Sequence, residues 1–120
     1  MQIDVITPFP AMIEPIFAES MLKRACDKEI VTIRCHDLRE FSEDKHCSVD
    51  DYPYGGGPGM ILKPEPVFRA VESILESGDT VSTLIILLTP QGNQYNQEKA
   101  VELSGYNRLI FICGHYRGID

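Results

Sequence analysis

The sequence predicts an α/β domain with a mainly parallel sheet and helices on its faces. Two continuous apolar runs, residues 84–88 and 109–113, are typical of strands buried on both faces of a parallel sheet. A helical pattern separates the two runs, so together they form one βαβ unit, which should cross over right-handed. The length of 120 residues fits one domain with a real core.

The first third of the chain shows the same alternation of strand and helix. Residues 2–7 are expected to form the first strand, which ends before Pro8. Apolar residues then recur at helical spacing to about Asp27. Residues 30–36 alternate between apolar and polar side chains, which indicates a strand with one more polar face.

Two further helices are predicted in the second half of the chain. An apolar stripe at helical spacing ends at Ser77 and Gly78, a typical helix stop. The stripe consists of Val67, Val71, Ile74 and Leu75. Asn96 can cap the next helix, which precedes the strand expected at 109–113.

The most unusual segment is residues 44–60, which combines acidic residues, a histidine, two prolines and four glycines. Such a composition fits neither a helix nor a central strand. A connection between two elements usually needs only a few residues, so a binding surface is favoured over a simple connector. A solvated loop with ordinary turn glycines remains the alternative.

Charge and hydropathy exclude some classes of protein. The formal net charge of -7 has the wrong sign for binding nucleic acid by bulk electrostatics. Six basic residues fall within 23–45, but neighbouring acids balance them, which favours a solvated surface over a basic patch. The apolar run at 84–88 is too short to span a bilayer, and no secretory signal is visible at the N-terminus.

The four cysteines form no CxxC pair, and without a signal peptide they are interpreted as reduced thiols of a cytoplasmic protein. Cys35 is followed by His36, but adjacent residues on a strand point to opposite faces and chelate poorly. The spacing typical of tetrahedral zinc sites is also missing, so no metal site is predicted.

Two short loops follow the predicted buried strands, at 89–92 and 114–118. Ligands of open parallel sheets bind beyond the carboxyl ends of the strands, where both loops begin. Neither loop matches a phosphate loop or a dinucleotide fingerprint. The sequence therefore favours a nucleotide-like ligand that is bound in another way.

The three loops together resemble a known family, the bacterial tRNA (guanine-N1)-methyltransferases of the SPOUT class. These enzymes methylate the guanosine just 3′ of the anticodon. The resemblance extends over essentially all 120 residues and matches the N-terminal part of the family. Its motifs are Ile3-Asp4-Val5-Ile6-Thr7, Phe9-Pro10, Arg39-Glu40-Phe41, Asp44-Lys45-His46, residues 49–51 and 53–60, Pro90-Gln91-Gly92 and Cys113-Gly114-His115-Tyr116.

The resemblance implies a trefoil-knotted methyltransferase domain, of which residues 1–120 form the N-terminal part with the knot incomplete. It implies S-adenosylmethionine as methyl donor, tRNA as substrate and a homodimer whose sites combine both subunits. A C-terminal tRNA-binding domain, present in the family, is absent from these 120 residues. The chain is therefore expected to be a fragment, and by itself either part of an enzyme or a non-catalytic folded or dimerising module.

The site residues implied by the resemblance fall into two groups. Those expected to bind the cofactor are Thr89, Pro90, Gln91, Gly92, Gly114, Tyr116 and Gly118. Those expected to face the guanine and the tRNA are Asp50, Gly55, Gly56, Gly57 and Gly59. Asp50 is the candidate catalytic carboxylate within the chain, because the family's proposed general-base aspartate lies beyond Asp120. Arg117 stands where the family commonly has glutamate, which reverses a charge near the second cofactor loop.

Overall fold

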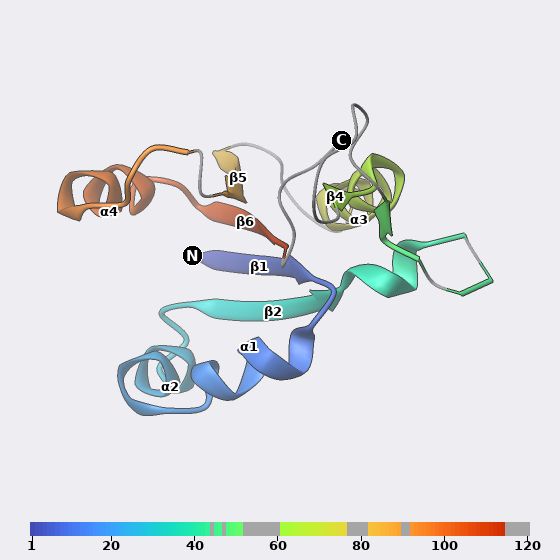
Figure 1. Cartoon of the computed structure of the whole chain (residues 1–120). Coiled ribbons are helices and arrows are strands. Elements are labelled where there is room, and N and C mark those ends of the chain that lie inside the picture. Colours follow the sequence, from blue (N-terminus) through green and yellow to red (C-terminus); the bar gives the residue numbers. More distant parts are fainter. Residues whose placement is uncertain (44, 47, 52–60, 77–81, 90–91, 115–120) are drawn as a thin grey trace.

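The computed structural model describes residues 1–43, 45–46, 48–51, 61–76, 82–89 and 92–114, with the backbone alone at 50, 51 and 61. Its main sheet has four strands in the order β2–β1–β6–β5 (Figure 1). All three strand pairs are parallel, which confirms the predicted α/β fold class. The strands are β1 (Gln2–Thr7), β2 (Thr32–Asp37), β5 (Thr83–Leu88) and β6 (Arg108–Cys113).

Helices cover both faces of this sheet. The described helices are α1 (Pro10–Phe17), α2 (Ser20–Asp27), the 3-10 helix η1 (Leu38–Phe41), α3 (Pro64–Glu76) and α4 (Gln97–Leu103). Strand side chains alternate between faces, so Ile6 and Ile112 lie on the face opposite Thr7 and Cys113. The first pair joins α3 in the main core, whereas the second pair borders α1.

A single helix was expected from the apolar spacing up to Asp27, but the structure has two. The backbone of Ser20 has a φ of 56°, in the left-handed region that a continuous right-handed helix does not contain. The chain turns there, and α2 packs beside α1 (Figure 1). Spacing alone missed this break because the apolar residues keep their period across it.

A small antiparallel ladder lies outside the main sheet. It pairs β3 (Asp50–Asp51) with β4 (Ile61–Leu62), and Asp50 is the partner of Leu62. The backbone amide of Lys63 also donates to the carbonyl of Val49 at 2.7 Å. Val49 and Leu62 are each only 2% exposed, so both ends of the glycine-rich segment are anchored in the core.

The expectation that residues 84–88 are buried on both faces is wrong for this chain. In the described structure, β5 is an edge strand that pairs only with β6. Ile85, Leu87 and Leu88 are 46%, 43% and 52% exposed. The same expectation is largely confirmed for β6, which lies between two strands and buries Ile110 completely. The two runs look alike in sequence, and their different exposure results from their different positions in the sheet.

Candidate functional site

Two of the predicted cofactor residues meet at the carboxyl ends of neighbouring strands. Leu88 of β5 and Cys113 of β6 are partners in the parallel register. Thr89 and Gly114 follow them directly, so they leave the sheet side by side. In Figure 1 the strands β1, β2 and β6 point toward the side that also carries β4 and α3. The sheet therefore brings the two predicted loops together at the edge where ligands of parallel sheets bind.

A hydrogen bond joins Thr89 and Gly92, the described ends of the first loop, and closes a turn. The backbone amide of Gly92 donates to the carbonyl of Thr89 at 3.3 Å. A β-carbon placed on Gly92 would lie 3.3 Å from Cγ2 of Thr89, so a larger residue would crowd the turn. Pro90 and Gln91, also predicted to bind the cofactor, lie outside the described residues.

A cavity of about 330 Å³ lies beside this turn. Its lining includes Leu84, Ile86, Thr89, Gly92 and Phe111. A mostly apolar lining with a few polar groups is typical of sites that bind small molecules. The cavity is therefore a candidate small-molecule site beside the first loop.

Gly114 begins the second loop, and its surroundings give a reason for glycine that sequence reasoning did not find. The backbone at Gly114 lies outside the left-handed region, so its conformation does not require glycine. A β-carbon there would instead lie 2.9 Å from Cδ1 and 3.3 Å from Cγ of Leu62. Tyr116 and Gly118, the other predicted residues of this loop, lie outside the described residues.

A smaller cavity of about 100 Å³ lies against Gly114. It is lined by Thr7, Phe9, Met12, Ile13, Cys113 and Gly114. Thr7 and Cys113 are the last residues of β1 and β6. The carboxyl ends of two adjacent strands, β1 and β6, therefore line the cavity where the second loop starts.

Of the predicted guanine-facing residues, the structure describes only the backbone of Asp50. Its pairing with Leu62 places it at the start of the ladder that anchors the glycine-rich segment. Gly55, Gly56, Gly57 and Gly59 lie outside the described residues.

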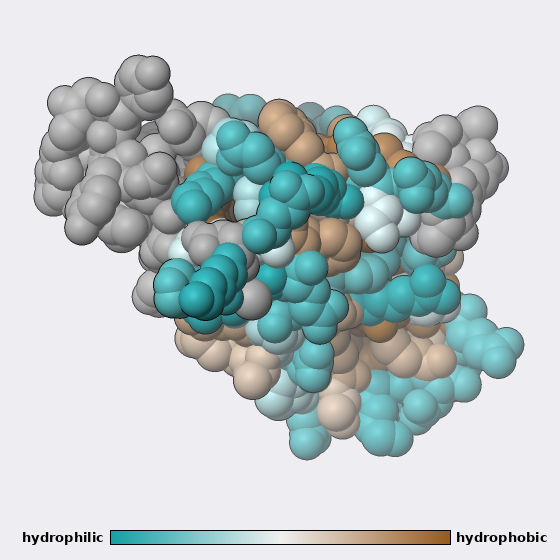
Figure 2. Space-filling view, turned by 90° about the vertical axis from the view of Figure 1, so that its right-hand side faces the viewer, coloured by the Kyte–Doolittle hydropathy of each residue, from teal (hydrophilic) through white to brown (hydrophobic). Residues whose placement is uncertain are grey.

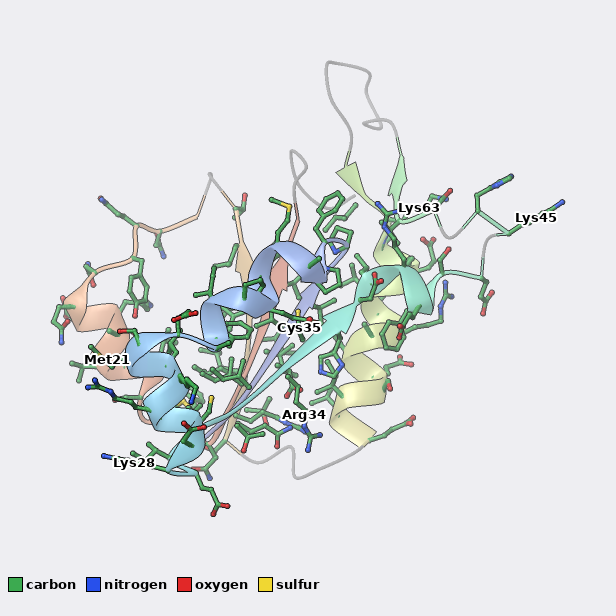
Figure 3. The ribbon with its side chains drawn as sticks, turned by 90° about the horizontal axis from the view of Figure 1, so that it is seen from below. Met21, Lys28, Arg34, Cys35, Lys45 and Lys63 are labelled. Atoms are coloured by element: carbon green, nitrogen blue, oxygen red, sulfur yellow. The ribbon has the colours of Figure 1, made fainter. Side chains whose placement is uncertain are left out.

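The face toward which the strands point is largely polar, with apolar residues exposed between the polar ones (Figure 2). Lys45 and Lys63 lie at the end of the molecule that carries β3 and β4, far from Lys28 (Figure 3). A polar hollow of about 200 Å³ at this end is lined by Lys63, Arg69 and Glu65 among others. The guanidinium of Arg69 is held there, because its Nε donates to the carbonyl of Phe41 at 2.7 Å.

Two thiols, those of Cys35 and Cys113, lack the properties of nucleophiles. Burial, with smaller contributions from Glu14, Cys113 and Asp37, raises the pKa of Cys35 to about 11. Burial also raises the pKa of Cys113. Because the thiolate is the reactive form, both side chains are protonated and unreactive at neutral pH. Within the described part of the chain, no group of three His, Cys, Asp or Glu side chains could hold a metal ion.

A buried charged cluster was not anticipated from the sequence. Asp4 is 1% exposed, and its Oδ1 lies 2.7 Å from Nε2 of His36. Its Oδ2 lies 3.6 Å from Nε of Arg108, which is 4% exposed. Gln2 donates to the same oxygen at 3.2 Å. Alternation along β1 and β2 could have indicated that Asp4 and His36 share a face, but not that they pair.

Comparison with known proteins gives consistent matches. A family model described as tRNA (Guanine-1)-methyltransferase TrmD matches residues 1–120. A tRNA (guanine-N(1)-)-methyltransferase from Dehalococcoides mccartyi is 55% identical over 120 residues, which cover 100% of this chain and 48% of that protein. The enzyme of the same name from Geobacillus kaustophilus is 52% identical, with 48% of its length covered.

A solved structure shows the same similarity in three dimensions. The tRNA (m1G37) methyltransferase from Aquifex aeolicus superposes with a TM-score of 0.88 at 38% sequence identity. The match covers 100% of this chain and 53% of that one. The chain thus spans about half the length of the relatives it matches.

Proposed function

Because the chain belongs to the tRNA (Guanine-1)-methyltransferase TrmD family, we propose that it supplies part of the site that transfers a methyl group to guanine N1 in tRNA. The target is the guanosine just 3′ of the anticodon, at position 37. The observation that carries the proposal is the placement of Thr89 and Gly114 after registered partners of two parallel strands. The β3–β4 ladder meets the same place through Leu62.

The proposed methyl donor is S-adenosylmethionine, whose sulfonium supplies an electrophilic methyl group when bound. Thr89 and Gly92, with Pro90 and Gln91 between them, would border the adenosine from one side. Gly114, followed by Tyr116 and Gly118, would border it from the other. The fit is supported by the apolar cavity of about 330 Å³ beside Thr89 and Gly92. Backbone groups at such turns can hydrogen-bond an adenine edge without a charged side chain.

The proposed guanine side consists of Asp50 with Gly55, Gly56, Gly57 and Gly59. A carboxylate can accept a hydrogen bond from the Watson–Crick edge of guanine, whose N1 proton must leave during methylation. The family's proposed general base would follow the 120 residues, so Asp50 is assigned to guanine recognition first. The positive charge of Arg117 does not support a role in accepting guanine donors.

We further propose a cytoplasmic homodimer with a trefoil knot completed by a longer chain. Exposed apolar side chains on α1 and α2 support a protein interface there, since Met12, Ile16 and Met21 are 66%, 57% and 77% exposed.

The alternative of a non-catalytic module applies to the 120 residues alone. It is favoured by the exposed apolar edge strand β5, which leaves this domain only partly covered.

The experiment uses a chimera in which residues 1–120 are followed by the remaining half of the Dehalococcoides mccartyi relative. The purified chimera, the complete relative and the 120-residue chain are each incubated with unmodified tRNA and tritiated S-adenosylmethionine. We expect the chimera to label tRNA and the isolated chain to transfer no methyl group. A folded chimera that transfers no methyl group while the relative does would contradict the proposal.

A further inference from the structure

Leu62 belongs by its backbone to the proposed guanine side of the site. It pairs with Asp50 across the β3–β4 ladder, and the neighbouring amide of Lys63 donates to Val49 at 2.7 Å. The ladder pairing and this hydrogen bond tie the position of Leu62 to that of the backbone at Asp50. A displacement of Leu62 is therefore a displacement of the backbone at Asp50.

By its side chain, Leu62 belongs to the proposed cofactor side. Its Cδ1 occupies the position next to Gly114, 2.9 Å from where a β-carbon would stand. The side chain is 2% exposed and packs in the core cluster with Ile110 and Ile112 of β6, the strand that ends just before Gly114. Close-packed interiors do not yield a few tenths of an ångström without moving other side chains.

We infer that Leu62 is a positioning residue that couples S-adenosylmethionine binding at Gly114 to guanine binding at Asp50. The inference rests on the proposed function of these two segments. When a cofactor fixes the backbone at Gly114, the leucine side chain is held against it and β4 is fixed in place. Fixing β4 orders Asp50 before guanine arrives, so that each ligand should tighten the binding of the other.

This arrangement also assigns a reason for glycine at position 114. If glycine is needed because Leu62 fills the adjacent space, shortening the leucine should make alanine acceptable. If glycine is needed because the cofactor itself approaches the backbone, shortening the leucine should change nothing. The two explanations predict opposite outcomes for the same double variant, which makes them separable by a double-mutant cycle.

The test uses the chimera defined above and measures S-adenosylmethionine affinity by calorimetry. The single variant Gly114→Ala should bind S-adenosylmethionine about tenfold more weakly than the original chimera. The double variant, which also carries Leu62→Val, should bind it within about threefold of the affinity of the single variant Leu62→Val. Valine lacks the Cδ atoms that crowd the site. If Leu62→Val proves too mild, Leu62→Ala removes the same contact and gives a second measurement.

A second readout separates coupling from stability. In the chimera without substitutions, tRNA that has not been methylated should tighten S-adenosylmethionine binding by about fivefold or more. Leu62→Val should bring this ratio close to one, whereas Leu109→Val should leave it unchanged. Leu109 is a matched control, because it is 4% exposed on β6 and borders none of the proposed ligand positions.

The outcomes distinguish the two proposals. An unmodified chimera that binds no S-adenosylmethionine would overturn the proposed function and this inference with it. The inference alone would be overturned if the original chimera binds S-adenosylmethionine and methylates tRNA, but the double variant binds the cofactor as weakly as Gly114→Ala does. Equal coupling ratios in the Leu62→Val and Leu109→Val variants would also overturn it.

Discussion

The carboxylate of Asp4 on β1 lies 3.6 Å from the guanidinium Nε of Arg108 on β6, with side-chain exposures of only 1% and 4%. The pair crosses the two central strands, and His36 extends it to β2. In the described structure, Nη1 of Arg108 has no hydrogen-bond partner. The guanidinium thus depends on Asp4 to offset its desolvation, which makes this carboxylate a structural requirement of the sheet.

Replacing Asp4 with alanine should destabilise the fold, because it leaves a buried positive charge without its partner. The expected loss in the free energy of unfolding is about 3 kcal/mol. Urea unfolding followed by circular dichroism measures it. Asp27→Ala is the control, because its ion pair with Lys23 is exposed and should be worth less than about 0.5 kcal/mol. Equal losses in both variants would show that burial of the pair has no consequence.

The pH dependence of stability should report the partly buried thiol of Cys35. Its pKa is raised from 9.0 to about 11 in the folded chain, so between these values the folded state keeps a proton that the unfolded state loses. Stability contributed by the neutral thiol is therefore present below pH 9 and falls as the pH rises toward 11.

Comparison with Cys35→Ala isolates this effect, because other titrating groups are common to both chains. The difference in unfolding free energy between the original chain and the variant should shrink from pH 8 to about pH 11. Chemical denaturation at several pH values measures the difference. A difference that stays constant, or grows, would contradict the burial of this thiol.

A charge on the exposed face of α1 should weaken the proposed dimer. Ile16 is 57% exposed, and a lysine there would have to be desolvated if this surface were covered by a second subunit. Sedimentation of the chimera should show a shift toward monomer for Ile16→Lys. Val101→Lys is the control, because Val101 is 63% exposed on α4, away from the proposed interface. If both variants stay dimeric, the interface lies elsewhere.

Sequence pattern predicted the order of strands and helices along the chain, because hydrophobic periodicity reflects which faces are buried. It could not separate β5 from β6, because an apolar run does not reveal whether its strand lies at the edge of a sheet. The break at Ser20 also escaped it, since a single left-handed residue changes the direction of the chain without changing the apolar period.

The sequence predicted which loops form the site, but not which side chains contact one another there. The positions of Thr89 and Gly114 after neighbouring strands follow from topology alone, and the structure agrees. The role of Leu62 was not predicted, because a leucine after a glycine-rich segment carries no chemical signal. Its place beside Gly114 arises only from the fold, which brings together two residues 52 positions apart.

Nucleoside analysis of tRNA treated with the chimera and S-adenosylmethionine tests directly whether this chain supplies part of a guanine-N1 methyl-transfer site. Digestion followed by mass spectrometry identifies the methylated nucleoside, and a primer-extension stop locates it on the tRNA. We expect 1-methylguanosine at the residue 3′ of the anticodon, with a lower yield after Asp50→Ala. Methylation of another base, or at another position of the tRNA, would contradict it.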